Sequence, residues 1–168
     1  MRRLAITLMT CVVVYGPDVA IPQPLKDSAY LCIQEFSGGL AYDAHTKRWD
    51  GAAFKTDTKF ILRLRYERPS LEGTLPTYYD YKLVITPFGT SEEHPCTPPG
   101  PTVEQRWWTP TITIGPSLFF TCTTSPGDYR FNLRTNRFLF TYPHGYVDGK
   151  DDINNMPHVS GGTCSKIE

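Results

Sequence analysis

The amino-acid sequence predicts an all-β protein, and three observations favour this class. Aromatic residues are frequent, with ten tyrosines, nine phenylalanines and three tryptophans. Fifteen prolines and thirteen glycines interrupt the chain more often than helices usually tolerate. Apolar and polar residues alternate, as in residues 60–66, and no segment keeps a helical period. We expect a small β-barrel or a two-sheet sandwich of about eight or nine antiparallel strands.

The N-terminal half of the domain is expected to begin with a strand over residues 30–34. Gly38-Gly39 is expected to turn the chain. A hairpin follows at residues 40–54, because Asp43 can accept a hydrogen bond from the backbone two residues further on. In residues 60–66 the leucines face one side and the two arginines the other, which is typical of a half-buried strand.

The C-terminal half continues with a strand over residues 78–86, which are rich in aromatic and β-branched residues. The proline-rich segment 87–101 is expected to be irregular. Short strands are expected on both sides of Gly115-Pro116. The chain then forms a hairpin at residues 129–142 and a last short strand near residues 158–164.

Two segments of the chain match each other. Residues 42–49 and 131–138 share an aromatic residue, an Asx residue, a threonine, an arginine and a second aromatic residue in the same places. Such a pattern is typical of a hairpin whose aromatic ends meet across the ladder. We hypothesise that the domain consists of two related β units, and the alternative is that a common turn arose twice.

The first twenty residues have the organisation of a signal peptide. Arg2 and Arg3 precede an apolar run at residues 4–15, which is too short to span a bilayer. Ala20 is a candidate last residue before cleavage. We therefore expect a domain of residues 21–168 that is periplasmic or secreted and has no stable membrane span after leader cleavage. A lipoprotein or a buried segment of the domain is the alternative.

The cysteines support export. Removal of Cys11 with the leader leaves an even number, which in an exported chain indicates two disulfides. Spacing does not choose among the three pairings that four cysteines allow. We favour Cys32–Cys164, which would tie the ends of the domain together, and Cys96–Cys122, which would attach the proline-rich segment to a central strand. A zinc site is disfavoured because no two cysteines lie close together along the chain.

The C-terminal part of the sequence resembles a family of small exported bacterial proteins to which no activity is assigned. The resemblance rests on the hairpin YRFNLRTNRF and the Gly-Thr-Cys ending at residues 162–164. The Tyr-x-Cys start at residues 30–32 and the hairpin residue Trp49 fit the same outline. The resemblance implies export and paired cysteines, and it implies no reaction.

The sequence contains few motifs that indicate a specific reaction or cofactor. Lysine plus arginine and aspartate plus glutamate each number 17, which excludes a broad basic face for nucleic acid. The usual hydrolase motifs are absent, so we consider a hydrolase using His144 or His158 less favoured than a protein without enzymatic activity. No cofactor is indicated except calcium, for which an oxygen-rich segment offers the weak candidates Asp148, Asp151, Asp152 and Asn154.

Aromatic and histidine residues are the main candidates for binding. Exposed aromatic faces can stack on sugars or hold a protein partner, although the same residues also fill the cores of small β domains. The candidates are Tyr78, Trp107, Trp108, His144 and Tyr146.

The function we expect is that of a non-enzymatic binding or envelope-interaction module with a protein or glycan partner. The first alternative is a secreted inhibitor of a lysozyme or protease, which a protruding rigid loop at residues 148–157 would favour. The second is a small hydrolase, which a concave site with a histidine and a carboxylate would favour. An open apolar lumen would instead favour a small lipophilic ligand.

Overall fold

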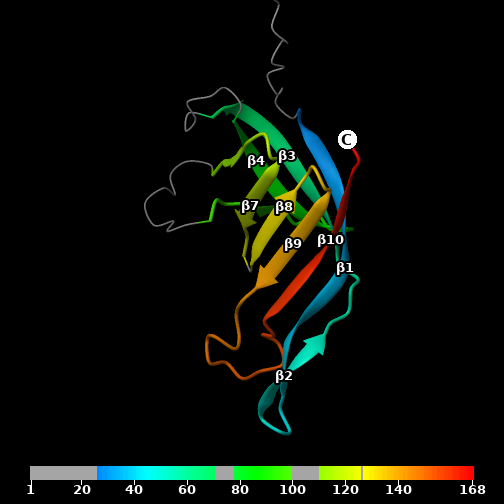
Figure 1. Ribbon diagram of the computed structural model, residues 1–168, viewed down its shortest axis with the longest axis vertical. Helices are drawn as coiled ribbons and strands as arrows, with labels where there is room; N and C mark the ends of the chain where they lie inside the picture. The colour runs from blue at the N-terminus through cyan, green and yellow to red at the C-terminus, as the bar shows by residue number, and fades with distance from the viewer. Residues whose placement is uncertain (1–25, 71–77, 100–109, 126) are drawn as a thin grey trace, which may run out of the picture.

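The computed structural model describes residues 26–70, 78–99, 110–125 and 127–168, which form a single antiparallel sheet (Figure 1). These residues contain no helix, so none is long and apolar enough to cross a membrane, and the predicted all-β class is confirmed. The ten strands are β1 (Ser28–Asp43), β2 (Arg48–Ala53), β3 (Lys59–Pro69), β4 (Tyr79–Pro87), β5 (His94–Pro95), β6 (Ile112–Ile114), β7 (Phe119–Thr123), β8 (Asp128–Asn132), β9 (Arg137–Tyr142) and β10 (His158–Lys166).

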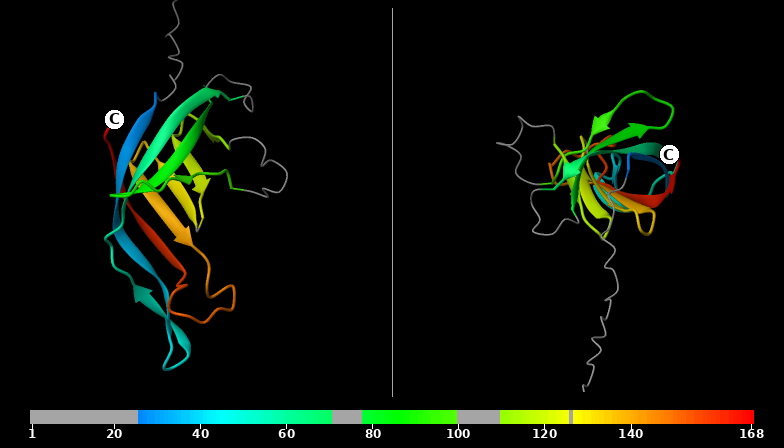
Figure 2. Two further views of the ribbon diagram at one scale, coloured as in Figure 1. Left: turned by 180° about the vertical axis from the view of Figure 1, so that it is seen from behind. Right: turned by 90° about the horizontal axis from the view of Figure 1, so that it is seen from above.

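The sheet curls into a half-barrel, and its inner face forms the hydrophobic core (Figure 2). Its hydrogen-bonded order is β5-β4-β3-β1-β10-β9-β8-β7, with β2 paired to β1 and β6 paired to β4. Of the two expected architectures, the structure is closer to the barrel than to the two-sheet sandwich, because one continuous sheet supplies the whole wall. The alternation in β3 is as predicted, with Phe60, Leu62 and Leu64 buried.

Aromatic side chains fill much of the core. The Phe60 ring meets the rings of Tyr129, Phe131 and Phe138 edge-on, with centroids 5.5, 6.3 and 5.0 Å away. The Phe131 ring also stacks on Phe120 at 5.2 Å. Residues from β3, β7, β8 and β9 therefore meet at one centre, which joins the two sides of the curled sheet.

The long strand β1 organises the sheet. One edge of β1 pairs with β10, and the other pairs first with β3 and then with β2. A register shift between Gln34 and Phe36 interrupts the pairing with β10. Beyond this point β1 runs past the half-barrel and forms a projecting hairpin with β2 (Figure 1).

The predicted turn at Gly38-Gly39 is wrong, because β1 continues straight through both glycines. Neither glycine has the positive φ that a glycine-specific turn would use. At Gly39 an added Cβ would instead collide with the Pro157 carbonyl oxygen and lie 2.7 Å from the Cα of His158. Glycine at position 39 therefore allows the chain at residues 157–158 to approach β1 closely.

The two matching segments form hairpin turns of the same geometry. Asp43 accepts hydrogen bonds from the backbone N–H groups two and three residues further on, at 2.8 and 3.4 Å. Asn132 accepts the equivalent pair at 3.0 and 3.3 Å. Lys47 and Asn136 then take left-handed φ values of 52° and 55°. The match covers the turns and their flanking strands, and an origin of the domain in two related units stays a hypothesis.

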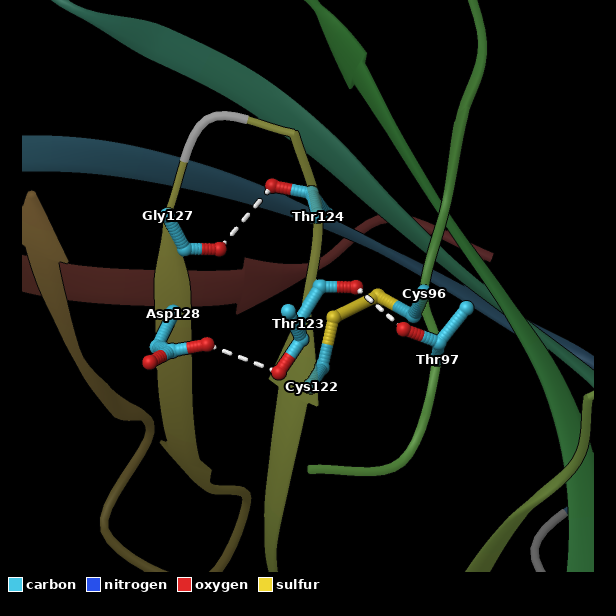
Figure 3. Close-up of a disulfide and its surroundings, with 7 residues drawn as sticks. All are labelled: Cys96, Thr97, Cys122, Thr123, Thr124, Gly127 and Asp128. Atoms are coloured by element: carbon cyan, nitrogen blue, oxygen red, sulfur yellow. Dashed lines mark hydrogen bonds between the residues drawn. A yellow bond between two sulfur atoms is a disulfide. The ribbon is translucent and has the colours of Figure 1, made fainter. Parts of the chain in front are cut away.

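Two disulfides join the same cysteine pairs that we favoured from the sequence. Cys32–Cys164 connects the adjacent strands β1 and β10, with 4.0 Å between the Cα atoms. Cys96–Cys122 connects the residue after β5 to β7, which are the two ends of the sheet order (Figure 3). Beside it, Thr97 and Thr123 exchange backbone hydrogen bonds of 2.9 and 2.8 Å. One covalent bond and one bridge therefore hold the ends of the curled sheet together.

We expect the double substitution Cys96→Ala and Cys122→Ala to lower the free energy of unfolding by about 2–5 kcal/mol. Chemical denaturation measures this loss. Hydrogen exchange should become faster at the Thr97 and Thr123 amides, because their bridge loses its covalent support. The control is the pair Cys32→Ala and Cys164→Ala, which lies inside a long β1–β10 ladder and should leave those two amides protected. Unchanged exchange in the first variant would contradict a closing role for this disulfide.

Candidate functional site

The first candidate site is a projecting lobe made of residues 38–53 and the loop of residues 143–157. Both segments extend beyond the half-barrel at the same end of the molecule (Figure 1). The backbone N–H of Leu40 donates to the carbonyl of Pro157 at 3.0 Å, so the loop joins the edge of β1 where β10 begins. A hairpin and a loop that are far apart in the sequence thereby form one unit.

Trp49 on β2 braces this lobe. Its indole N–H donates to Oδ1 of Asp151 at 2.7 Å, across 102 residues of sequence. The Tyr146 ring meets the indole edge-on with centroids 5.7 Å apart, and the Tyr42 ring lies 5.3 Å away on the neighbouring strand. The side chain therefore contacts both segments of the lobe through a hydrogen bond and through ring packing.

The loop also fixes its own conformation. Asp152 Oδ1 accepts from the backbone N–H groups of Asn154 and Asn155 at 2.6 and 3.0 Å. These bonds, led by the one from Asn154, hold the pKa of Asp152 below its usual value. The Tyr142 hydroxyl donates to Asn155 Oδ1 at 3.0 Å and ties the loop to β9. Gly145 takes a φ of 95°, and a Cβ there would collide with the Asn155 carbonyl. Local hydrogen bonds and one required glycine therefore define the loop.

The carboxylates proposed for calcium are turned to partners within the protein. Asp151 accepts from Trp49, and Asp152 accepts from the backbone of its own loop. Asp148 lies 3.5 Å from Nδ1 of His144 and 3.4 Å from the backbone nitrogen of Gly145. In the part of the chain that the structure describes, no group of three or more acidic, histidine or cysteine residues is arranged to hold a metal ion.

The same loop exposes large apolar side chains. Tyr146, Val147 and Ile153 are 55%, 79% and 59% exposed. Exposed apolar residues on a rigid scaffold indicate a candidate protein-binding surface, because this combination is common at protein interfaces. Tyr146 was a candidate from the sequence, whereas Val147 and Ile153 were not. We refer to these three residues as the exposed loop residues.

The second candidate site is a cavity of about 80 Å³ on the inner face of the half-barrel, near the start of β10. Aromatic walls and neutral polar groups surround it. The lining residues are Gln34, Thr58, Phe60, Tyr129, Phe138, Phe140, His158 and Ser160. The core fills the rest of the inner face, so the small cavity differs from the open apolar lumen that would favour a lipophilic ligand.

His158 links the cavity to the lobe. Its Nδ1 donates to the carbonyl of Met156 at 2.9 Å, which leaves Nε2 as an acceptor in the neutral ring. Its ring contacts those of Phe54, Phe140 and Tyr142 at 5.8, 5.7 and 5.5 Å. The hydrogen bond and these three contacts determine where the imidazole lies.

The histidines do not form the site expected for a hydrolase. His144 is exposed and pairs with Asp148 on the loop surface, with its ring 5.2 Å from Tyr142. His158 lies in the cavity wall, and among the described residues no carboxylate pairs with it. A histidine and a carboxylate therefore meet at an exposed position rather than in a concave site.

Other residues from the sequence analysis lie elsewhere or outside the described ranges. Tyr78 precedes β4, is 41% exposed, and covers Gly115. Trp107 and Trp108 lie outside the described residues. The bracing role of Trp49 and the places of Phe140 and Ser160 in the cavity lining were not predicted from the sequence. Only Phe140 carried a usable signal, the period-two alternation of β9.

Comparisons of the chain with protein-family models, curated proteins and solved structures find no match. A functional proposal for this protein therefore depends on the two candidate sites themselves.

We expect Trp49→Phe to loosen the lobe, because phenylalanine keeps an aromatic ring but cannot donate to Asp151. The loss should be about 1 kcal/mol in the free energy of unfolding. Hydrogen exchange should become faster at the Leu40 amide, which donates to Pro157. Asp151→Asn is the matched control, because an asparagine oxygen can still accept the indole hydrogen. Equal protection of Leu40 in Trp49→Phe and in the unchanged protein would show that Trp49 does not brace the lobe.

Burial raises the pKa of the Tyr129 hydroxyl from 10.0 to about 12. A raised pKa in the folded state means that folding favours the neutral phenol. The contribution of Tyr129 to the free energy of unfolding is therefore complete below pH 10 and is lost as the pH rises towards 12. We expect the free energy of unfolding to fall between pH 10 and pH 12 by at most about 3 kcal/mol. Denaturation at stepped pH measures this fall, and Tyr129→Phe should lessen it. An equal fall in that variant would assign the effect to other groups.

Proposed function

We propose that this protein is a non-enzymatic binding module outside the cytosol that contacts a protein partner through its projecting lobe. The observation that carries the proposal is the group of exposed loop residues held on a rigid loop. Because the loop is already ordered, binding loses little conformational freedom there. Apolar and aromatic side chains presented in this way supply the buried centre of many protein interfaces.

The cysteines support a location outside the cytosol. Both disulfides are buried, and disulfides persist in oxidising environments outside the cytosol. The apolar run behind Arg2 and Arg3 has the length and flanks of a signal peptide, which favours export to the periplasm or secretion. We propose one of these two locations as the place where the lobe meets its partner.

An inhibitor of a lysozyme or protease is the more specific candidate within this class. The loop of residues 143–157 protrudes, and its hydrogen bonds define its shape before any partner is bound. A rigid projecting loop of this kind can enter an enzyme cleft with little rearrangement. The paired residues His144 and Asp148 are exposed on it, so they are available as polar contacts at the edge of such an interface.

The test of the lobe uses the protein recovered from cells that export it, followed by native mass spectrometry for a retained partner. We expect Val147→Asp to weaken the complex at least about tenfold, since a charge would replace an apolar side chain at the contact. Val159→Asp is the matched control, because Val159 is also exposed but belongs to β10. Circular dichroism checks that both variants fold. Equal retention of the partner by both variants would contradict binding through the lobe.

The inhibitor candidate has a separate test. Purified protein is added to a panel of lysozymes and of serine, cysteine and metalloproteases, and residual activity is measured against concentration. We expect inhibition of at least one enzyme and loss of that inhibition in Val147→Asp. Inhibition that is the same in Val147→Asp and in the unchanged protein would exclude the loop as the inhibitory element.

A further inference from the structure

The cavity beside β10 has the properties of a built ligand site. Its aromatic walls come from three strands, β3, β8 and β9. The ring centroids of Tyr129 and Phe140 lie 4.6 Å apart and those of Phe60 and Phe138 lie 5.0 Å apart. Each ring is therefore held by another ring, and the apolar surface of the cavity keeps its shape without a ligand.

Unpaired polar groups line the same cavity. Ser160 is 5% exposed, and its hydroxyl has no hydrogen-bond partner among the residues that the structure describes. A serine hydroxyl can donate and accept a hydrogen bond, so this one is free to do both towards a group that enters the cavity. The side-chain amide of Gln34, on the neighbouring strand, also lacks a protein partner in the described ranges. His158 adds the acceptor Nε2, because its Nδ1 is occupied by Met156.

The lining excludes several kinds of ligand. It contains no aspartate, glutamate, lysine or arginine, so an ionic group entering it would lose its hydration without gaining an opposite charge. Its volume is about 80 Å³, which admits a small chemical group. A whole sugar ring or a lipid chain needs more space. The occupant must therefore be a small neutral group with an apolar part and with both a hydrogen-bond donor and an acceptor.

We propose that the cavity binds the acetamido group of an N-acetylated amino sugar. The methyl group would pack against the rings of Phe60, Phe138 and Phe140. The amide carbonyl would accept from the Ser160 hydroxyl or the Gln34 amide, and the amide N–H would donate to Nε2 of His158. This arrangement gives the methyl group, the carbonyl and the N–H group of the ligand a partner each in the cavity.

The surroundings favour a sugar over a peptide amide. The rings of Phe54 and Tyr142 both contact His158 at the cavity wall, and the Tyr142 ring continues to His144. Aromatic rings therefore extend from the cavity towards the lobe, where the C–H faces of a sugar can pack on them. The exposed residue Thr58 lies on the cavity lining, so the cavity reaches the surface where a sugar ring would remain.

The experiment is a titration followed by two-dimensional NMR of the full folded protein. N-acetylglucosamine and acetamide are the probes, and glucose and glucosamine are the comparisons that lack the acetyl group. We expect millimolar N-acetylglucosamine and acetamide to shift the amide signals of Gln34, His158 and Ser160, with N-acetylglucosamine binding more tightly. Glucose and glucosamine should leave these signals unchanged.

Two variants test the assigned contacts. Ser160→Ala should weaken binding of N-acetylglucosamine about five- to tenfold, since the amide carbonyl loses a hydrogen bond. Ser165→Ala is the control, because Ser165 lies on the same strand and is exposed. The lobe variant Val147→Asp should bind the sugar normally, which separates this proposal from the proposed protein partner.

Three outcomes would overturn the proposal. The first is the absence of any response to N-acetylglucosamine in the unchanged protein, which does not depend on the folding of a variant. The second is an equal response to glucose, because the acetyl group would then play no part. The third is a response to acetamide without one to N-acetylglucosamine, which would assign the cavity to a peptide amide.

Discussion

The structure depends on closure of a curled sheet between its first and last strands. A single sheet without a second layer buries its inner face by wrapping around it, and wrapping brings its first and last strands towards each other. Here the covalent bond between Cys96 and Cys122 and the bridge between Thr97 and Thr123 make that junction (Figure 3). The aromatic centre around Phe60 and Phe131 lies between the walls that this junction holds. The cavity exists because the rings close most of that space but not all of it.

The lobe follows from the length of one strand. β1 has sixteen residues, more than its half-barrel neighbours can pair with, so its last part continues outward with β2. Close approach at Gly39 then brings the end of the 143–157 loop against β1, and Trp49 joins the loop to the hairpin. The same strand thus contributes Gln34 to the cavity and a side of the lobe further along. Both candidate sites share a support, although their chemistry differs.

The sequence was sufficient for features that arise locally. Alternation in residues 60–66, the Asx turns at Asp43 and Asn132, and the even cysteine count led to the all-β class, two hairpins and two disulfides. Gly38-Gly39 was misjudged because composition does not distinguish a glycine that turns the chain from one that admits a neighbouring strand. The contact between Trp49 and Asp151 spans 102 residues and has no local signal. Ser160 and Gln34 are ordinary residue types, and only the tertiary arrangement leaves them unpaired around a cavity.

The pairing of β1 with β10 has a consequence for how the molecule can be attached to something else. The backbone N–H of Ile167 donates to the carbonyl of Ala29 at 2.8 Å, so β1 begins beside the end of β10. This meeting point lies at the pole opposite the lobe (Figure 1). A tether, fusion or immobilising support joined near the start of β1 or the end of β10 would therefore leave the hairpin and loop facing away from the anchor. Such an orientation suits reagents that display the protein on beads or on a cell.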